Sequence, residues 1–153
     1  MSKPEVKSLY ETDYYAWVNE QLELLRSGQF QKADMQNLLD EIEDMSKKVK
    51  RELESRLKVL LIHLLKWQYQ PDRRGASWEI TIKGQRSEIA DLLSDNPSLK
   101  SKLEEAISKA YKHAVYYAHI ETGYPEEDFP PCCTWCFDEF MDDQFWPERF
   151  FRE

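Results

Sequence analysis

Apolar residues recur every third or fourth position along most of the chain, which is the spacing of one face of an α-helix. The first such stripe consists of Tyr14, Trp17, Val18, Leu22 and Leu25. Polar N-cap residues precede it and a glycine follows it, and both favour helix ends at these points. The pattern therefore predicts a helix over residues 12–27 whose apolar stripe is buried.

A second stripe runs through residues 34–70 without a proline, and Pro71 forces its end. Its apolar positions are Leu38, Ile42, Met45, Val49, Leu53, Leu57, Leu60 and Leu64. They predict a helix of unusual length, for which a kink or short break near Ser46 is the alternative to a continuous helix. Residues 57–65 are apolar almost all round, which places this part at the centre of a helix bundle.

Two further helices are predicted over residues 77–94 and 98–122. Residues 78–83 alternate between apolar and polar side chains, as a half-buried strand would. No partner strand is evident elsewhere, and a single strand is not stable alone, so we interpret this segment as helix. Asn96-Pro97 separates the two helices, and Gly123 ends the second.

Residues 124–153 differ from the rest, because aromatic side chains are interleaved with acids and prolines. Large aromatic side chains bury much apolar area even without regular structure. We therefore expect an irregular aromatic C-terminal strap with a short helix near Trp135–Met141, and an exposed partner-binding patch is the alternative. The whole pattern predicts an all-α fold. It is one helical domain over residues 1–153, with a four-helix-bundle-like core, the strap over 124–153 and the short terminal helix.

The 153 residues carry a formal net charge of -8, which is divided unevenly. Residues 46–112 carry a net charge of +6, whereas the segments on either side are acidic. The acidic total argues against non-specific nucleic-acid binding, which depends on neutralising phosphates, but the basic segment keeps a local anion site open. No run of 18 apolar residues occurs, and residues 1–5 contain no apolar stretch. We therefore expect a cytoplasmic protein without a membrane span or a signal peptide.

The candidate anion-binding residues are His63 and Lys66 on the long predicted helix, followed in the chain by Arg73, Arg74, Trp78 and Arg86. Arginine and lysine side chains bind phosphate or carboxylate, and a histidine can act as a general base near neutral pH. The alternative interpretation is structural. In that case His63 is hydrogen-bonded across a helix interface, and Lys66 and Arg73 lie in solvent.

Glu41 and Glu43 belong to an acidic cluster that would chelate a divalent cation only with ligands from other helices. Di-iron helix bundles carry Glu-x-x-His pairs, and none of the three histidines follows a glutamate at that spacing. The alternative is pairing of the cluster with lysines one turn on. The three cysteines, in residues 132–136, are one ligand short of a structural zinc site, so we expect free thiols. We assign no metal and no cofactor.

Several segments stand out in order along the chain: Leu9-Tyr10-Glu11-Thr12-Asp13-Tyr14-Tyr15-Ala16-Trp17, Asn37-Leu38-Leu39-Asp40-Glu41-Ile42-Glu43-Asp44-Met45, His63-Leu64-Leu65-Lys66-Trp67-Gln68-Tyr69-Gln70-Pro71, Ser77-Trp78, Gln85-Arg86 and Phe145-Trp146-Pro147. Together they resemble the domain-of-unknown-function family 29, a bacterial and chiefly cyanobacterial family. The resemblance spans about residues 9–148. It implies a small helical cytoplasmic protein without an established activity, and it brings no catalytic residues with it.

Two functions are consistent with these features, and whether the protein is an enzyme is left open. The first is a helical protein that acts by protein–protein interaction or self-association, with a protein partner or a second copy of itself. The alternative is a phosphoesterase or nuclease-like enzyme. Its site would combine His63 and Lys66 with a metal at Glu41 and Glu43, while the arginines and Trp78 hold the phosphate.

Overall fold

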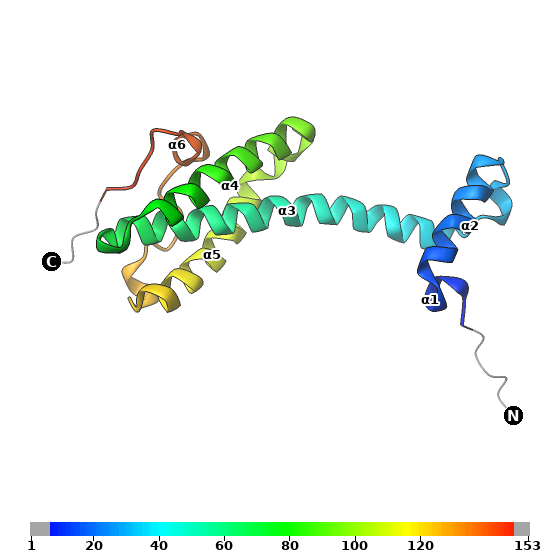
Figure 1. Cartoon of the computed structure of the whole chain (residues 1–153), viewed down its shortest axis with the longest axis horizontal. Coiled ribbons are helices and arrows are strands. Elements are labelled where there is room, and N and C mark those ends of the chain that lie inside the picture. The colour runs from blue at the N-terminus through cyan, green and yellow to red at the C-terminus, as the bar shows by residue number, and fades with distance from the viewer. Residues whose placement is uncertain (1–6, 149–153) are drawn as a thin grey trace, which may run out of the picture. The chain divides into compact units, whose positions relative to one another are not determined.

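The computed structural model describes residues 7–148 of the chain. Its internal contacts divide the chain into two compact units, Met1–Lys47 and Lys48–Glu153, which we call unit 1 and unit 2. The described residues contain helices and irregular segments but no strand, so the predicted all-α class is confirmed (Figure 1). The expectation of one helical domain over residues 1–153 stays a prediction.

Unit 1 contains α1 (Leu9–Thr12), α2 (Tyr14–Arg26) and the beginning of α3 (Met35–Tyr69). Asp13 caps α2, since its side chain accepts a hydrogen bond from the backbone N–H of Ala16 at 3.0 Å. After α2 the chain turns at Gly28, whose φ of 74° lies in the left-handed region that glycine adopts without strain. A short 3₁₀ helix, Phe30–Lys32, leads into α3.

The anchor of unit 1 is Trp17, which is 4% exposed. Its indole Nε1 donates to the Asp34 carboxylate at 3.1 Å, and the backbone N–H of Asp34 donates to the side chain of the buried Gln21 at 2.6 Å. Asp34 also accepts a hydrogen bond from the backbone N–H of Asn37, so it joins α2 to the first turn of α3. This carboxylate therefore fixes the entry into α3.

The predicted burial of the α2 stripe is wrong except at Trp17. Tyr14, Val18, Leu22 and Leu25 are all exposed, because the buried side of α2 in unit 1 is the one with Trp17 and Gln21. The spacing identified an apolar stripe correctly, but only part of its width is covered.

The long helix α3 is continuous from Met35 to Tyr69, with no break at Ser46. It ends where Pro71 begins a 3₁₀ turn, Pro71–Arg73, as proline cannot continue the hydrogen-bond ladder. Its polar residues before Val49 are mostly exposed, whereas the leucines from Leu53 onward are fully buried.

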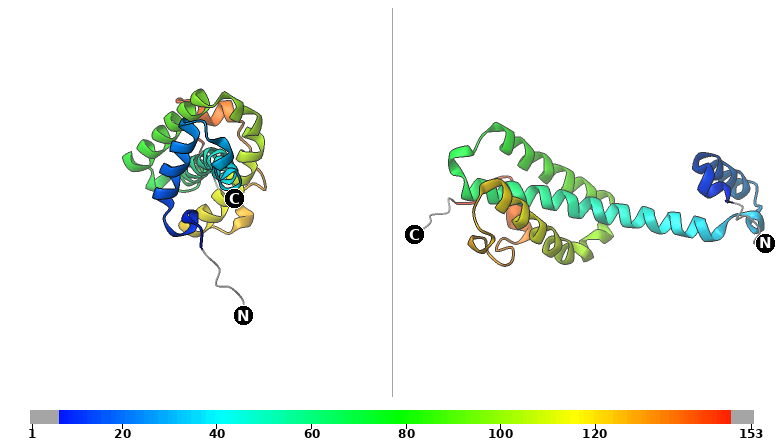
Figure 2. Two further views of the ribbon diagram at one scale, coloured as in Figure 1. Left: turned by 90° about the vertical axis from the view of Figure 1, so that its right-hand side faces the viewer. Right: turned by 90° about the horizontal axis from the view of Figure 1, so that it is seen from below.

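Unit 2 is built from the C-terminal part of α3 with α4 (Ala76–Asp95), α5 (Leu103–Thr122) and α6 (Phe137–Met141). Both α4 and α5 run alongside this part of α3 (Figures 1 and 2). Residues 78–83 lie within α4, so the helix interpretation of this segment is confirmed. The segment Pro97–Lys102, where we expected the first turns of a helix, forms a 3₁₀ helix before α5.

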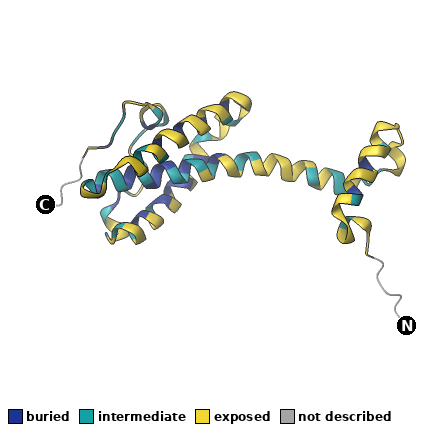
Figure 3. Ribbon diagram, viewed as in Figure 1, coloured by how far each residue is buried: buried dark blue, intermediate teal, exposed yellow. Residues whose placement is uncertain are grey.

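One hydrophobic cluster fills unit 2, and Figure 3 shows the buried residues gathered where α3, α4 and α5 face one another. Its members are Leu53, Leu57, Leu60, Leu61, Ile62, Leu64, Leu65, Tyr69, Ile82, Ile89, Leu93, Ala106, Ala110, Tyr111, Ala114, Ala118, Phe129 and Phe140. The small alanines of α5 let that helix approach closely, and the leucines of α3 fill the space between the helices.

The C-terminal strap follows Gly123, packs against the cluster and includes the short helix α6, as predicted. Phe129 and Phe140 are buried in the cluster. Two buried tyrosines hold the strap by its backbone: the Tyr69 hydroxyl donates to the carbonyl of Asp128 at 3.0 Å, and the Tyr111 hydroxyl donates to that of Pro130 at 2.6 Å. Phe150 and Phe151, the last aromatic residues of the strap expected over 124–153, lie outside the described residues. Among residues 7–148, no helix is both long and apolar enough to cross a membrane.

Candidate functional site

His63 lies on α3 in unit 2, half-buried, with its Nδ1 2.8 Å from the carbonyl oxygen of Val59 one turn earlier. A carbonyl oxygen can only accept, so Nδ1 carries the proton in this contact. Burial lowers the pKa of His63, the charge of Lys66 lowers it further, and the hydrogen bond to Val59 and the charge of Glu121 act in the opposite direction. The imidazole is therefore neutral at pH 7.

Lys66 lies one turn after His63 and connects three helices. Its Nζ is 2.9 Å from the carboxylate of Glu121 on α5 and 4.7 Å from the ring centre of Trp78 on α4. The lysine side chain is 13% exposed, so this ion pair is partly shielded from solvent. The structure thus places Lys66 near both His63 and Trp78, but the ammonium is already occupied by a carboxylate and an aromatic face.

Arg86 on α4 is buried in unit 2, with 2% of its surface exposed. Its Nε donates to the carbonyl of Phe140 at 2.9 Å, and one Nη donates to the carbonyl of Phe145 at 2.7 Å. The guanidinium also lies 5.4 Å from the ring centre of Trp146. Arg86 therefore holds the C-terminal strap by its backbone.

Arg74 makes similar contacts with Trp67. Its Nε donates to the carbonyl of Trp67 at 2.7 Å, and its guanidinium lies 5.1 Å from the Trp67 ring centre. The ring centres of Trp67 and Trp146 are 4.4 Å apart, so successive contacts connect Arg74 to Trp67, Trp67 to Trp146 and Trp146 to Arg86. Arg73 is exposed.

Glu41 and Glu43 lie in unit 1 and have different partners. The hydroxyls of Tyr10 and Tyr14 donate to the Glu41 carboxylate at 2.5 and 2.8 Å. The hydrogen bond to Glu41, together with desolvation and the carboxylate charge, raises the pKa of Tyr10 to about 12. Glu43 is exposed and pairs with Lys47 at 3.8 Å, as the one-turn spacing predicted. Among residues 7–148, no group of three His, Cys, Asp or Glu side chains is placed to hold a metal ion.

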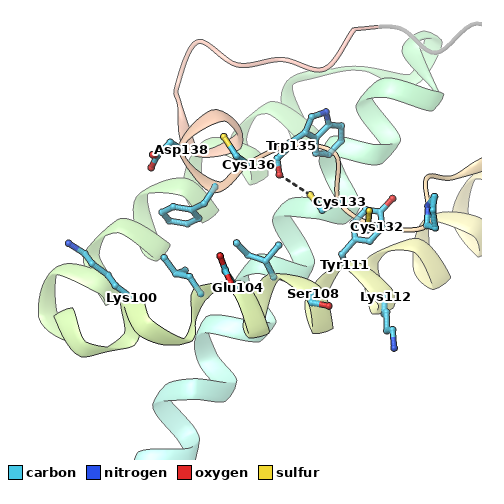
Figure 4. A pocket seen from close by; sticks show the side chains of 14 residues that line it. Lys100, Glu104, Ser108, Tyr111, Lys112, Cys132, Cys133, Trp135, Cys136 and Asp138 are labelled. Atoms are coloured by element: carbon cyan, nitrogen blue, oxygen red, sulfur yellow. Dashed lines mark hydrogen bonds between the residues drawn. The ribbon is translucent and has the colours of Figure 1, made fainter.

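A cavity of about 580 Å³ lies between α5 and the C-terminal strap (Figure 4). Apolar side chains of both segments line it, and its charged lining residues comprise two lysines and two acids, namely Lys100, Lys112, Glu104 and Asp138. This balance favours neither an anion nor a cation. The three cysteines also line it and are free thiols. Burial raises the pKa of Cys133, whose Sγ donates to the carbonyl of Trp135 at 3.3 Å, so this thiol is protonated at neutral pH.

The feature that sequence reasoning missed is an uncovered apolar face on the first part of α3. Met35, Leu39, Ile42 and Met45 are 45, 64, 60 and 64% exposed. They are spaced by three or four residues, so they share one side of the helix, and we call them the apolar face of α3. The sequence shows that apolar and charged residues alternate around this part of the helix, which indicates an apolar face. The pattern alone does not indicate whether another element covers that face.

Comparison with curated proteins and with solved structures gave no match in either case. The chain matches the family described as "Domain of unknown function DUF29" over residues 9–146, which is nearly its whole length. Its motif residues Trp67, Trp78, Arg86 and Trp146 take part in the contacts that hold α3, α4 and the strap together. The match covers residues of both units and, apart from Pro147, every residue of the segments that carried the resemblance, and the chain therefore belongs to this family of unknown function.

Proposed function

We propose that the protein acts by protein–protein interaction, through the apolar face of α3. The single observation that carries this proposal is the exposure of Met35, Leu39, Ile42 and Met45 at helical spacing. Helical recognition between proteins uses anchors at this spacing, one apolar stripe lying against another apolar surface. Clustered apolar side chains left in water on a well-formed helix mark an interaction site more often than scattered ones do.

Unit 1 carries further exposed apolar side chains outside this face. Val18, Leu22 and Leu25 of α2 are 37, 40 and 36% exposed, and Phe30 in the connection to α3 is 57% exposed. A partner that covered both helices would remove all of these side chains from water, and each Å² of apolar surface so covered contributes about 25 cal/mol. This arrangement supports a partner-binding role for unit 1, and the free cysteines support a reducing, cytoplasmic location.

The alternative, a phosphoesterase or nuclease-like enzyme, remains a hypothesis from the sequence. Its arginines Arg74 and Arg86 donate to backbone carbonyls, and Lys66 pairs with Glu121. No observation favours it over the interaction role.

Site-specific photo-cross-linking tests the proposal. A benzophenone amino acid is placed at Leu39, and a matched control at Lys83, which is exposed on α4 and pairs within its own helix with Glu79. We expect cross-linked adducts, with this chain or another protein, from position 39 and not from position 83. Adding Ile42→Asp to the Leu39 probe should remove the adducts, because a carboxylate cannot enter an apolar interface without a large desolvation cost. Equal adduct formation at the two positions, or none at either, would contradict the proposal.

A further inference from the structure

We infer that the apolar face of α3 binds a second copy of itself, with the two α3 segments antiparallel. This inference rests on the proposed function and identifies the partner. It rests on the order of charges along the two sides of the face. Because of this order, the segment is electrostatically complementary to a second copy of itself that runs in the opposite direction.

Each flank of the apolar face carries an acid followed, seven residues later, by a base. One flank has Glu43 and then Lys50, and the other has Glu41 and then Lys48. Seven residues correspond to about two helical turns, so each acid and its base lie on the same side of α3. Both flanks are therefore negative towards the N-terminus of the helix and positive towards its C-terminus.

Two such helices that pack antiparallel place like flanks together, so that each acid meets a base. A two-fold axis near Met45 and Ser46 puts Glu43 opposite Lys50 of a second copy, and Glu41 opposite Lys48 of a second copy. The same register puts Ile42 opposite Val49, with Met45 at the axis. An isologous two-fold interface repeats every such contact, so one register satisfies both flanks twice.

A parallel pair has the opposite electrostatics. Equivalent positions then lie at the same height, so the acidic blocks of the two copies face each other and so do the basic blocks. Juxtaposed like charges oppose association and select against that orientation. The charge order thus determines the orientation, while the apolar face supplies the driving force.

The contacts that these charged residues make within the chain are compatible with a second copy. Lys50 is 3.1 Å from Glu105 and Glu43 is 3.8 Å from Lys47, in pairs whose side chains are 36 to 66% exposed. Exposed pairs of this kind contribute little, and an ammonium has three donors, so Lys50 can keep Glu105 and still donate to another carboxylate. Glu41 accepts from Tyr10 with one carboxylate oxygen and from Tyr14 with the other, and each oxygen has a further lone pair for another donor.

Single-cysteine cross-linking tests the pairing and its orientation, in a full-length chain whose native Cys132, Cys133 and Cys136 are replaced by serine. Met45→Cys places a thiol near the axis, whereas Gln36→Cys places it roughly 28 Å from its counterpart in an antiparallel pair, at about 1.5 Å per residue. With a short bis-maleimide reagent we expect a covalent dimer from position 45 and not from position 36. Dimers from both positions would show a parallel pair and overturn the inference.

Charge exchange provides an independent readout by sedimentation velocity. Glu43→Lys and Lys50→Glu each create two repulsive contacts in the homodimer, and each should raise its dissociation constant roughly tenfold. An equimolar mixture of the two variants restores opposite charges at both contacts and should dimerise like the unmodified chain. Failure of the mixture to recover would overturn the antiparallel register.

The outcomes separate this inference from the proposed function. A chain that stays monomeric over the whole concentration range, but cross-links to a different protein from position 39, overturns the second-copy partner and keeps the interaction role. A monomeric chain without position-specific adducts contradicts both. Circular dichroism of every variant confirms that α3 has folded.

Discussion

Arg86 shows how a single charged side chain can be structural in the middle of a hydrophobic unit. Burial lowers the pKa of its guanidinium, and the charges of Asp143 and Asp142 partly offset this decrease. The guanidinium donates hydrogen bonds to two carbonyls of the strap. Arg86→Met keeps much of the side-chain volume but leaves those carbonyls without their donors, so we expect a loss of about 2–4 kcal/mol of unfolding free energy. Urea titration followed by circular dichroism measures this. Arg73→Met, at an exposed position, is the control and should change stability by less than about 0.5 kcal/mol. Equal effects of the two substitutions would refute the role of Arg86.

Glu41 controls the titration of the two tyrosines that donate to it. The Glu41 hydrogen bond is the largest cause of the raised pKa of Tyr10, about 12, and it also raises the pKa of Tyr14. Glu41→Gln removes the negative charge, so both pKa values should fall towards the ordinary phenol value of about 10. Ring ¹³C chemical shifts of Tyr10 and Tyr14 against pH measure this, and Glu43→Gln should leave them unchanged.

The hydrogen bond from Tyr10 to Glu41 also makes the unfolding free energy depend on pH in alkaline solution. The folded-state pKa of Tyr10 lies above the unfolded value, so its contribution is complete below pH 10 and is lost as the pH rises through about 12. The unmodified chain should therefore lose more stability than Glu41→Gln over that interval. An identical alkaline loss in both proteins would show that the phenols do not depend on Glu41.

At the scale of the elements, two glycines of similar exposure are predicted to respond oppositely to alanine. Gly84 lies inside α4 and a Cβ there would meet no heavy atom within 4 Å, whereas Gly123 ends α5 with φ of 78°. Gly84→Ala should raise the unfolding free energy by about 0.5–1 kcal/mol, because alanine favours helix and restricts the unfolded chain. Gly123→Ala should lower it by about 1 kcal/mol or more, since alanine strains the left-handed conformation. Thermal unfolding of the two variants compares them, and the same sign of change in both would contradict this account.

The helices were largely predictable because their ends and their spacing are local properties. Pro71 and Gly123 end α3 and α5, and the lack of any partner strand favoured helix over strand for residues 78–83. Burial was not predictable to the same extent. The apolar spacing is alike before and after Val49, yet Ile42 is 60% exposed and Leu53 is 0% exposed. A periodic pattern identifies which face of a helix is apolar. Whether that face is buried depends on an element from a distant part of the sequence, which the local pattern does not reveal.

The candidate site shows the same limit at longer range. Helical spacing alone puts Lys66 one turn after His63 on α3. The partners of Arg86 are carbonyls of Phe140 and Phe145, more than fifty residues later, and backbone acceptors leave no signature in side-chain identity. Arg86, which the sequence suggested as an anion-binding residue, therefore stabilises the fold instead. The signal that could have indicated this was the presence of Trp67 and Trp146, which are flat partners for a guanidinium and lie far apart in the sequence.

For the molecule as a whole, the two units differ in how much they bury. The buried residues of unit 1 within the described chain are Trp17 and Gln21, whereas unit 2 contains the hydrophobic cluster of α3, α4, α5 and the strap. Local unfolding free energies follow buried apolar contact, so a unit with few buried side chains opens before one with a full core. We therefore expect unit 1 to unfold at a lower urea concentration than unit 2 in dilute solution.

Trp17 makes this prediction measurable, because the other four tryptophans, Trp67, Trp78, Trp135 and Trp146, belong to unit 2. After incorporation of 5-fluorotryptophan, the ¹⁹F resonance of Trp17 should pass to its unfolded position at a lower urea concentration than the other four. A second copy that covers the apolar face of α3 binds only folded unit 1, so the Trp17 midpoint should also rise with protein concentration. The unit 2 midpoints should respond less, and Ile42→Asp should abolish the concentration dependence without lowering them. Coincident transitions of all five resonances at every concentration would show instead that the chain unfolds as one cooperative body.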